Sequence, residues 1–175
     1  MFFHSPVLLF QTYFLIIFFA KLVLGDIVIE LFADKAPRAV ENFRSLAQSG
    51  YYNGCGFHRV APGLLIQTGD PTGTGSGVGE SIWGGHFEDE FAKELRHDAP
   101  YTVSMANLGR PDTNGSQFFI TLKEAAEFDD RNVVFGRVVS GQEIVDAIGA
   151  EIPRTDRPDV KIIKVIVKSK FYQCL

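Results

Sequence analysis

Short apolar runs separated by turn-forming residues make up most of the chain after Gly25, a pattern typical of β-strands. In the first run, residues 26–32, Ile27, Ile29 and Leu31 recur at period two, as they do in a strand with one buried face. Clusters of Gly, Pro, Asn and Asp separate the runs and favour turns. Further strands are predicted at residues 57–60, 64–67, 102–105, 117–122, 133–139 and 160–168. Residues 18–23 would add another strand by pairing with 27–32 across a turn at 24–26.

Two segments depart from this pattern and predict helices. The first begins near Pro37, which suits an early helical position, repeats Val40 and Phe43 at helical spacing, and ends at Gly50. The second begins at a Ser-x-x-Glu capping box, residues 140–143, and ends at Gly149. Two short helices among so many strands favour a mainly β fold, a closed eight-stranded antiparallel barrel capped by the helices, because closure removes exposed strand edges.

The first 24 residues differ from the rest of the chain. They contain no acidic residue, and Lys21 is their only Lys or Arg. Such a stretch is typical of a signal peptide or a membrane anchor, although no small-x-small cleavage site is evident. The alternative is that its end forms a buried first strand. The compartment therefore stays open between the secretory pathway or a membrane and the cytoplasm or nucleus.

Length and composition are those of one folded domain. The chain has 175 residues, 46% of them hydrophobic, which is enough for a substantial core. The predicted organisation is a hydrophobic N-terminal segment (1–24), one domain (25–170) and a C-terminal tail (171–175). A net charge of −4, with Lys and Arg spread along the chain, disfavours nucleic-acid binding. We expect a monomer, with membrane contact only through residues 1–24.

Several kinds of chemistry lack support in the sequence. The two cysteines, Cys55 and Cys174, make no disulfide framework, and the histidines are too scattered for a metal site. The glycine-rich stretch 73–79 is followed by no Lys-Ser or Lys-Thr pair and no strand-to-helix crossover, so it predicts a loop. Ser104 and Ser116 lack the surroundings of a hydrolase nucleophile. We therefore expect neither a cofactor nor a metal.

Residues 57–70, 104–107 and 113–120 hold the candidate chemistry. An arginine within a strand cannot point unpaired into an apolar interior, so Arg59 and Gln67 are predicted to face outward. Their neighbours include Leu65 and Phe119, and a charged group on an apolar floor is typical of a recognition site. The alternative interpretation is a solvated arginine on an amphipathic strand.

These segments resemble the cyclophilin signature. The resemblance extends from Gly25 to Lys168 in unbroken order and includes residues 30–37, 41–44 and 133–138. The loop at 69–75 together with 81–84 (Ser-Ile-Trp-Gly) resembles the compact single-domain branch found among spliceosome-associated cyclophilins. The resemblance implies a peptidyl-prolyl cis-trans isomerase that assists protein folding. Its partners would be proline-containing peptides or proteins, bound in a groove on the outer face of a barrel.

The resemblance also implies roles for individual residues. Arg59 would donate a hydrogen bond to the prolyl nitrogen, Gln67 would orient Arg59, and Asn107 would hold the peptide main chain. Substrate-binding positions are predicted at Leu64, Leu65, Ala106, Gln117, Phe119, Phe128 and Asn132.

The chain departs from the usual family pattern at several of these positions. Leu64 replaces phenylalanine, Leu65 methionine, Phe128 leucine and Asn132 histidine, and Arg110 is an inserted residue that would lengthen one groove loop. An acidic residue, at position 127, stands where cyclosporin-sensitive members have tryptophan, which predicts weak binding of the drug. Two interpretations stay open: an active isomerase, or a prolyl-peptide binding module or scaffold with little catalysis. A third possibility is that the unusual N-terminus disrupts the barrel.

Overall fold

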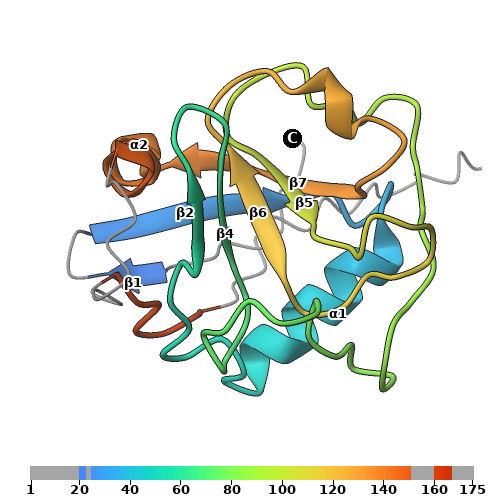
Figure 1. Ribbon diagram of the computed structural model, residues 1–175, viewed down its shortest axis with the longest axis horizontal. Coiled ribbons are helices and arrows are strands. Elements are labelled where there is room, and N and C mark those ends of the chain that lie inside the picture. The colour runs from blue at the N-terminus through green and yellow to red at the C-terminus, as the bar shows by residue number, and fades with distance from the viewer. Residues whose placement is uncertain (1–19, 23–24, 151–159, 167–175) are drawn as a thin grey trace, which may run out of the picture.

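A computed structural model describes residues 20–22, 25–150 and 160–166. Its strands form one antiparallel sheet in the order β1-β2-β7-β5-β6-β4-β3 (Figure 1). The strands are β1 (Ala20–Leu22), β2 (Gly25–Leu31), β3 (Arg59–Ala61), β4 (Leu65–Thr68), β5 (Thr102–Met105), β6 (Phe118–Thr121) and β7 (Val134–Ser140). Most of the strands expected after Gly25 are therefore present, with shifts of one or two residues at their ends.

Helix α1 (Pro37–Gln48) packs against the sheet through its apolar face and closes the main core. Phe43 is almost fully buried, and its ring centroid lies 5.1 Å from that of Phe118 and 5.2 Å from that of Phe135. Pro37 occupies the first turn, where its missing N–H has no hydrogen bond to lose. Sequence spacing thus predicted both the start and the buried face of this helix.

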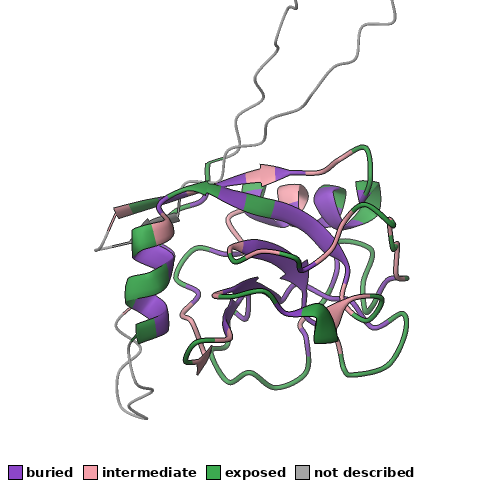
Figure 2. Ribbon diagram, turned by 90° about the horizontal axis from the view of Figure 1, so that it is seen from above, coloured by how far each residue is buried: buried purple, intermediate pink, exposed green. Residues whose placement is uncertain are grey.

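Helix α2 (Gln142–Ala150) has one buried and one exposed side (Figure 2). The predicted capping box does not begin it, because Ser140 is the last residue of β7 and pairs with Val28 of β2. The helix starts two residues later, after Gly141, and continues through Gly149. A single 3₁₀ turn, η1 (Ala126–Phe128), lies between β6 and β7.

The expected closed eight-stranded barrel is not confirmed. Among the described residues no ladder joins the edge strands β1 and β3. The strand expected at 160–168 is wrong over 160–166, where a single bridge pairs Gly56 with Lys161. Period-two burial fails there: Ile162 and Val165 are buried while Lys164 between them is exposed. A segment that buries residues three apart cannot present one face to a sheet.

The N-terminal predictions fall mostly outside the described residues. Three residues of the predicted 18–23 strand form β1 and pair with the start of β2, Ala20 opposite Ile27. The signal-peptide and anchor interpretations concern residues 1–24, and of these the structure describes only β1. Within the described ranges, no helix combines the length and apolarity needed to span a bilayer.

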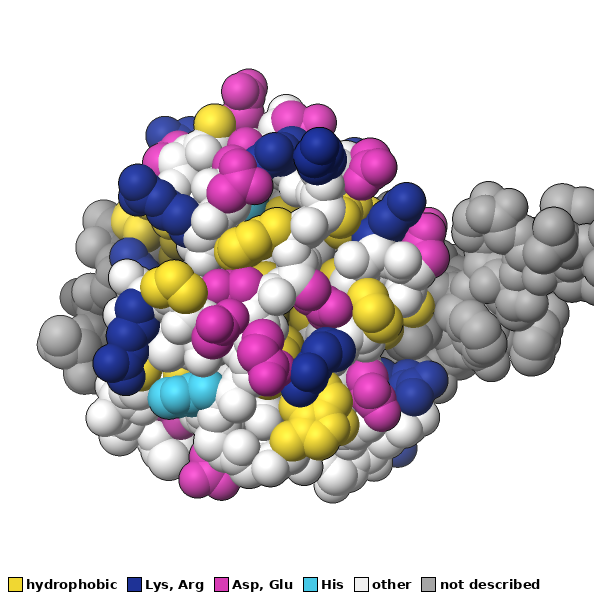
Figure 3. All heavy atoms as spheres, turned by 90° about the vertical axis from the view of Figure 1, so that its right-hand side faces the viewer, with side chains coloured by type: hydrophobic (Ala, Val, Ile, Leu, Met, Phe, Trp, Pro, Cys, Tyr) yellow, Lys and Arg dark blue, Asp and Glu magenta, His cyan; other side chains and the backbone are white. Residues whose placement is uncertain are grey.

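On the face of the molecule shown in Figure 3, acidic and basic side chains are interspersed.

Candidate functional site

Strand register places the candidate residues in one row across the sheet. Arg59 of β3 lies opposite Gln67 of β4, Gln67 lies opposite Phe119 of β6, and Phe119 lies opposite Ser104 of β5. Directly paired residues project to the same side of a sheet. Four residues that are far apart in the sequence are therefore brought side by side by hydrogen-bonded pairing.

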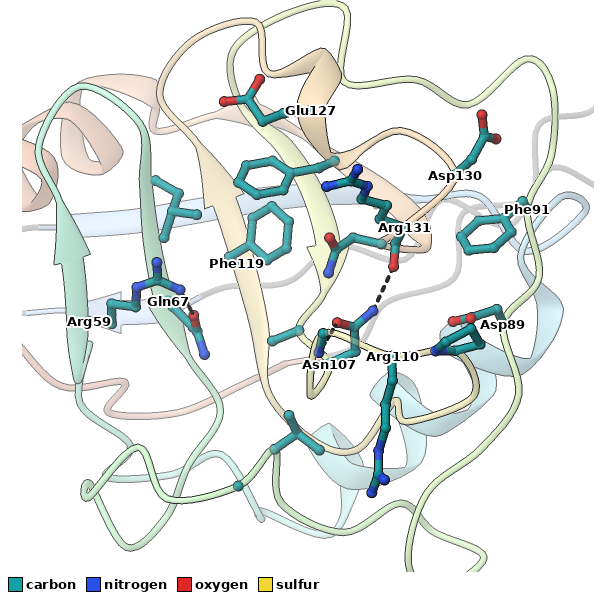
Figure 4. A pocket seen from close by; sticks show the side chains of 18 residues that line it. Arg59, Gln67, Asp89, Phe91, Asn107, Arg110, Phe119, Glu127, Asp130 and Arg131 are labelled. Atoms are coloured by element: carbon teal, nitrogen blue, oxygen red, sulfur yellow. Dashed lines mark hydrogen bonds between the residues drawn. The ribbon is translucent and has the colours of Figure 1, made fainter.

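A groove of about 560 Å³ lies over this row (Figure 4). Of the predicted site residues, the structure places these along its wall: Arg59, Gln67, Asn107, Leu65, Ala106, Phe119, Phe128 and Asn132. Leu64 and Gln117 do not line it. Leu64 is half-buried and packs against the wall from the side, while Gln117 is fully buried behind Gln67.

The arginine at the groove is held by a chain of amide side chains. Arg59 Nη1 donates to Gln67 Oε1 over 3.2 Å, and Gln67 Nε2 donates to Gln117 Oε1 over 2.9 Å. Both glutamines are buried, whereas Arg59 itself is exposed. The guanidinium is thus oriented from one side and open to a ligand on the other.

Beside the guanidinium lies a small apolar cluster, separate from the main core. Its buried members are Leu65, Ala106 and Phe119, and Phe128 packs at its edge with its ring centroid 5.1 Å from that of Phe119. We call these four residues the socket. An apolar socket next to an oriented cation, in one groove, can bind a group that combines a nonpolar ring with a hydrogen-bond acceptor.

Asn107 uses its side chain within the protein. Its Nδ2 donates to the Arg131 carbonyl over 2.6 Å, and its Oδ1 accepts from the Gly109 N–H over 3.0 Å (Figure 4). Asn132 Nδ2 likewise donates to the Met105 carbonyl over 2.9 Å. These amides fix the loops that wall the groove.

Sequence reasoning missed a buried Ser-His-Asp arrangement behind the socket. His97 Nδ1 lies 2.8 Å from Asp129 Oδ1, and His97 Nε2 lies 2.7 Å from Ser104 Oγ. Burial lowers the pKa of His97, although Asp129 acts in the opposite direction. Ser104 and His97 are both fully buried, so no substrate reaches the hydroxyl, and this is no hydrolase site.

The His97 arrangement instead supports the socket. The imidazole stacks on the Phe119 ring at 6.1 Å between centroids and meets the Phe128 ring edge-on at 5.7 Å. Hydrogen bonds at both ring nitrogens hold the imidazole in one orientation, and the two aromatic walls rest on it. His97, Ser104 and Asp129 share no local sequence motif, so no sequence signal could have revealed that they meet behind the socket.

Further residues at the groove rim lie outside the predicted catalytic and substrate-binding set. Phe91, 46% exposed, lines the groove, and so do Asp89 and Arg131. Arg110 lines it too, and its carbonyl accepts a hydrogen bond from Thr113 Oγ1 over 2.7 Å, which fixes this loop. Glu127 stands on the opposite rim beside Phe128.

Comparisons with known proteins point to one family over most of the chain. Residues 16–168 match the family model described as "Cyclophilin type peptidyl-prolyl cis-trans isomerase/CLD". The human peptidylprolyl isomerase domain and WD repeat-containing protein 1 is 56% identical over 149 residues, which are 83% of this chain and 23% of that protein. Human peptidyl-prolyl cis-trans isomerase-like 3 is 53% identical over 124 residues, 71% of this chain and 76% of that protein. The chain thus spans about a quarter of the length of the first of these relatives.

Solved structures show the same fold. A crystal structure of a cyclophilin type peptidyl-prolyl cis-trans isomerase from Cryptosporidium parvum superposes with a TM-score of 0.83 at 38% identity, covering 90% of this chain and 99% of that one. A second crystal structure of that protein was determined in the presence of the dipeptide Ala-Pro and superposes with a TM-score of 0.74.

Proposed function

The chain belongs to the cyclophilin-type peptidyl-prolyl cis-trans isomerases, and we propose that it catalyses rotation about X-Pro bonds in peptides and proteins. The observation that carries this proposal is the row that sets the Arg59 guanidinium, oriented by Gln67, beside the apolar socket at Phe119. The reaction needs no cofactor, because no covalent bond is made or broken.

The chemistry required is selective binding of a twisted amide. Rotation about a peptide bond has a barrier of about 18–20 kcal/mol because resonance is lost, and uncatalysed X-Pro isomerisation takes tens to hundreds of seconds. In the twisted state the prolyl nitrogen becomes pyramidal and basic. A guanidinium that donates to this nitrogen binds the twisted state better than either planar isomer, and this difference accelerates the reaction.

Each residue has a part in this proposal. The socket of Leu65, Ala106, Phe119 and Phe128 receives the proline ring, and Arg59 donates to the prolyl nitrogen. Gln67 orients Arg59, and the backbone of Asn107 contacts the peptide main chain. Charge-assisted hydrogen bonds of about 1.5–3 kcal/mol each correspond to about 10–100-fold in rate when they form only in the twisted state.

The alternative is a prolyl-peptide binding module with little turnover. The leucines at 64 and 65 favour it, and so does the side-chain amide of Asn132, which is hydrogen-bonded within the protein.

Isomerisation of a fluorogenic Xaa-Pro tetrapeptide separates the two functions. We expect Arg59→Ala to lower kcat/KM by about 10–100-fold, the value of one charge-assisted hydrogen bond. Arg137→Ala is the matched control, because Arg137 is also exposed, does not line the groove, and its guanidinium pairs with Asp98. Equal, near-background rates for the unaltered chain and Arg59→Ala, with peptide binding retained, leave only the binding module.

A further inference from the structure

Charged side chains of both signs line the groove in equal number. The wall carries three carboxylates and three guanidiniums: Asp89, Glu127, Asp130, Arg59, Arg110 and Arg131. Their sum therefore gives a peptide no preference for either charge. A preference arises from the charges that no protein group has already neutralised, and from where these stand along the groove.

Two of the three carboxylates are already used within the protein. Asp130 Oδ2 lies 2.8 Å from Arg96 Nη1. Asp89 Oδ1 accepts a hydrogen bond from Asn114 Nδ2 over 2.8 Å, and its Oδ2 accepts from a backbone N–H over 3.0 Å. Within the described ranges, Glu127 is exposed and takes part in no ion pair. Glu127 is thus the carboxylate of the groove that can meet a cation from a ligand without first giving up a partner.

The backbone on both sides of Glu127 is anchored. The Ala125 N–H donates to the His97 carbonyl over 2.9 Å, and the Phe128 N–H donates to the Ala125 carbonyl over 3.0 Å. On the other side, Asp129 Oδ1 accepts from the His97 N–H over 2.9 Å. The turn η1 thus holds Glu127 directly before Phe128 of the socket, and little of its backbone has to be ordered when a ligand binds.

The Glu127 charge acts through the socket wall. Burial lowers the pKa of His97 behind the socket, and Asp129 and Glu127 both act against that lowering. A field that extends to a side chain behind the wall also extends to a ligand in front of it. Arg110 stands on the opposite side of the groove (Figure 4), and in the part of the chain that the structure describes it forms no ion pair either. An unpaired carboxylate and an unpaired guanidinium therefore face a peptide from opposite sides.

We propose that Glu127 is a specificity-determining residue, and that the groove prefers prolyl peptides with Lys or Arg one or two residues from the proline, on the side that crosses η1. An extended chain advances only about 3.3–3.6 Å per residue, so these positions stay close to the rim when the proline occupies the socket. On the other side of the proline the peptide approaches Arg110, which repels a cation. The inference rests on the proposed function of the same groove and names the class of substrate it selects.

Capped alanine-based peptides around one proline test this, each with a single Lys or Gln placed one or two residues before or after the proline. NMR exchange at low peptide concentration gives kcat/KM without an auxiliary protease that would itself respond to charge. For the unaltered chain we expect Lys to exceed Gln by about 1.5–5-fold on one side of the proline only, the effect of one exposed ion pair. High salt should reduce this ratio towards one.

Variants assign the preference to a residue. The Lys-to-Gln ratio should become one in Glu127→Gln and fall below one in Glu127→Lys, with the fold of each variant checked by circular dichroism. Because each ratio compares two peptides on the same variant, a general loss of activity cancels. Glu124→Gln is the matched control: Glu124 is exposed and lies just before η1 but does not line the groove, so its ratio should equal that of the unaltered chain.

Two results overturn the proposal: a Lys preference that survives in Glu127→Gln, or one of equal size on both sides of the proline, which would reflect the net charge of −4 and not this rim. Binding of the same peptides, labelled and followed by fluorescence anisotropy, separates this failure from failure of the isomerase function. In a chain without turnover, the ratio of Kd values should still favour Lys and lose that preference in Glu127→Gln. Normal turnover with a ratio of one at every position would overturn the charge preference and leave the isomerase function intact.

Discussion

Two apolar clusters lie in the sheet, and they differ in what surrounds them. The main core is sealed: Phe43, Phe118 and Phe135 are almost fully buried and contact one another. The socket is equally well packed from behind, where His97 supports Phe119, but its front opens into the groove. Neighbouring residues of one strand supply both clusters, since Phe118 belongs to the core and Phe119 to the socket. The same residue type thus contributes stability at one position and ligand binding at the next.

Truncation of the sealed core should have the largest effect. Phe135→Ala deletes a ring with no exposed surface and leaves a cavity among rings that cannot collapse. We expect the free energy of unfolding to fall by about 3–5 kcal/mol. Urea denaturation followed by circular dichroism measures it. Under conditions where the variant is fully folded, kcat/KM should be close to that of the unaltered chain, and a large loss there would contradict the separation of the two clusters.

The matched change in the socket should act mainly on activity. Phe119→Ala removes a wall that receives the proline ring, which we expect to lower kcat/KM by about 10–100-fold, from the roughly 1.5–3 kcal/mol of a buried aromatic contact. Its cost in unfolding free energy should be smaller than that of Phe135→Ala, because the groove admits water to the space left. Tetrapeptide kinetics and denaturation of both variants provide the comparison. A Phe119→Ala variant with unchanged kcat/KM would remove the socket from the mechanism.

Acid should weaken the protein through His58 and His97. His58 and His97 have folded-state pKa values below the ordinary 6.5, so the unfolded chain binds their protons more readily. Their contribution to stability is therefore complete above about pH 6.5 and declines as the pH falls below it. Asp129, whose pKa is lowered from 3.8 by hydrogen bonds from His97 that outweigh its burial, adds a further loss only at pH values below this range.

Urea unfolding at a series of pH values between 8 and 4 checks this expectation. The free energy of unfolding should be flat down to about pH 6.5 and then fall. His86→Gln should leave the curve unchanged, since His86 is exposed. A stability that rises on acidification through this window would contradict the neutral state of both buried rings.

The smallest expected effect concerns the groove rim at Glu127. A carboxylate there cannot donate the hydrogen bond that the indole of cyclosporin-sensitive relatives would offer, so we expect weak inhibition by the drug. Glu127→Trp should raise the affinity by about 2–12-fold, the value of one ordinary hydrogen bond. Competition in the isomerase assay measures this affinity. Submicromolar inhibition of the unaltered chain would show that the rim does not determine the binding of the drug.

Local sequence signals predicted most elements, whereas the predicted groove residues came mainly from the resemblance to the family. Period-two runs located the strands, and Pro37 with the apolar spacing after it located α1, because these signals reflect backbone geometry that each segment has on its own. The same signals failed at 160–166, where Ile162 and Val165 join the main core although only a single bridge pairs this segment. They failed also at Ser140, where pairing with β2 prevailed over a capping box.

By itself, the sequence determined which residue types stand on which strand, and its ordered motifs determined the family. Only the tertiary structure decided which of them meet: the row from Arg59 to Ser104, the withdrawal of Gln117 behind Gln67, and the support of the socket by His97 and Asp129. Alternation and capping depend on residues a few positions apart. Register and side-chain contact depend on segments tens of residues apart whose pairing is settled only when the whole sheet and its core form together.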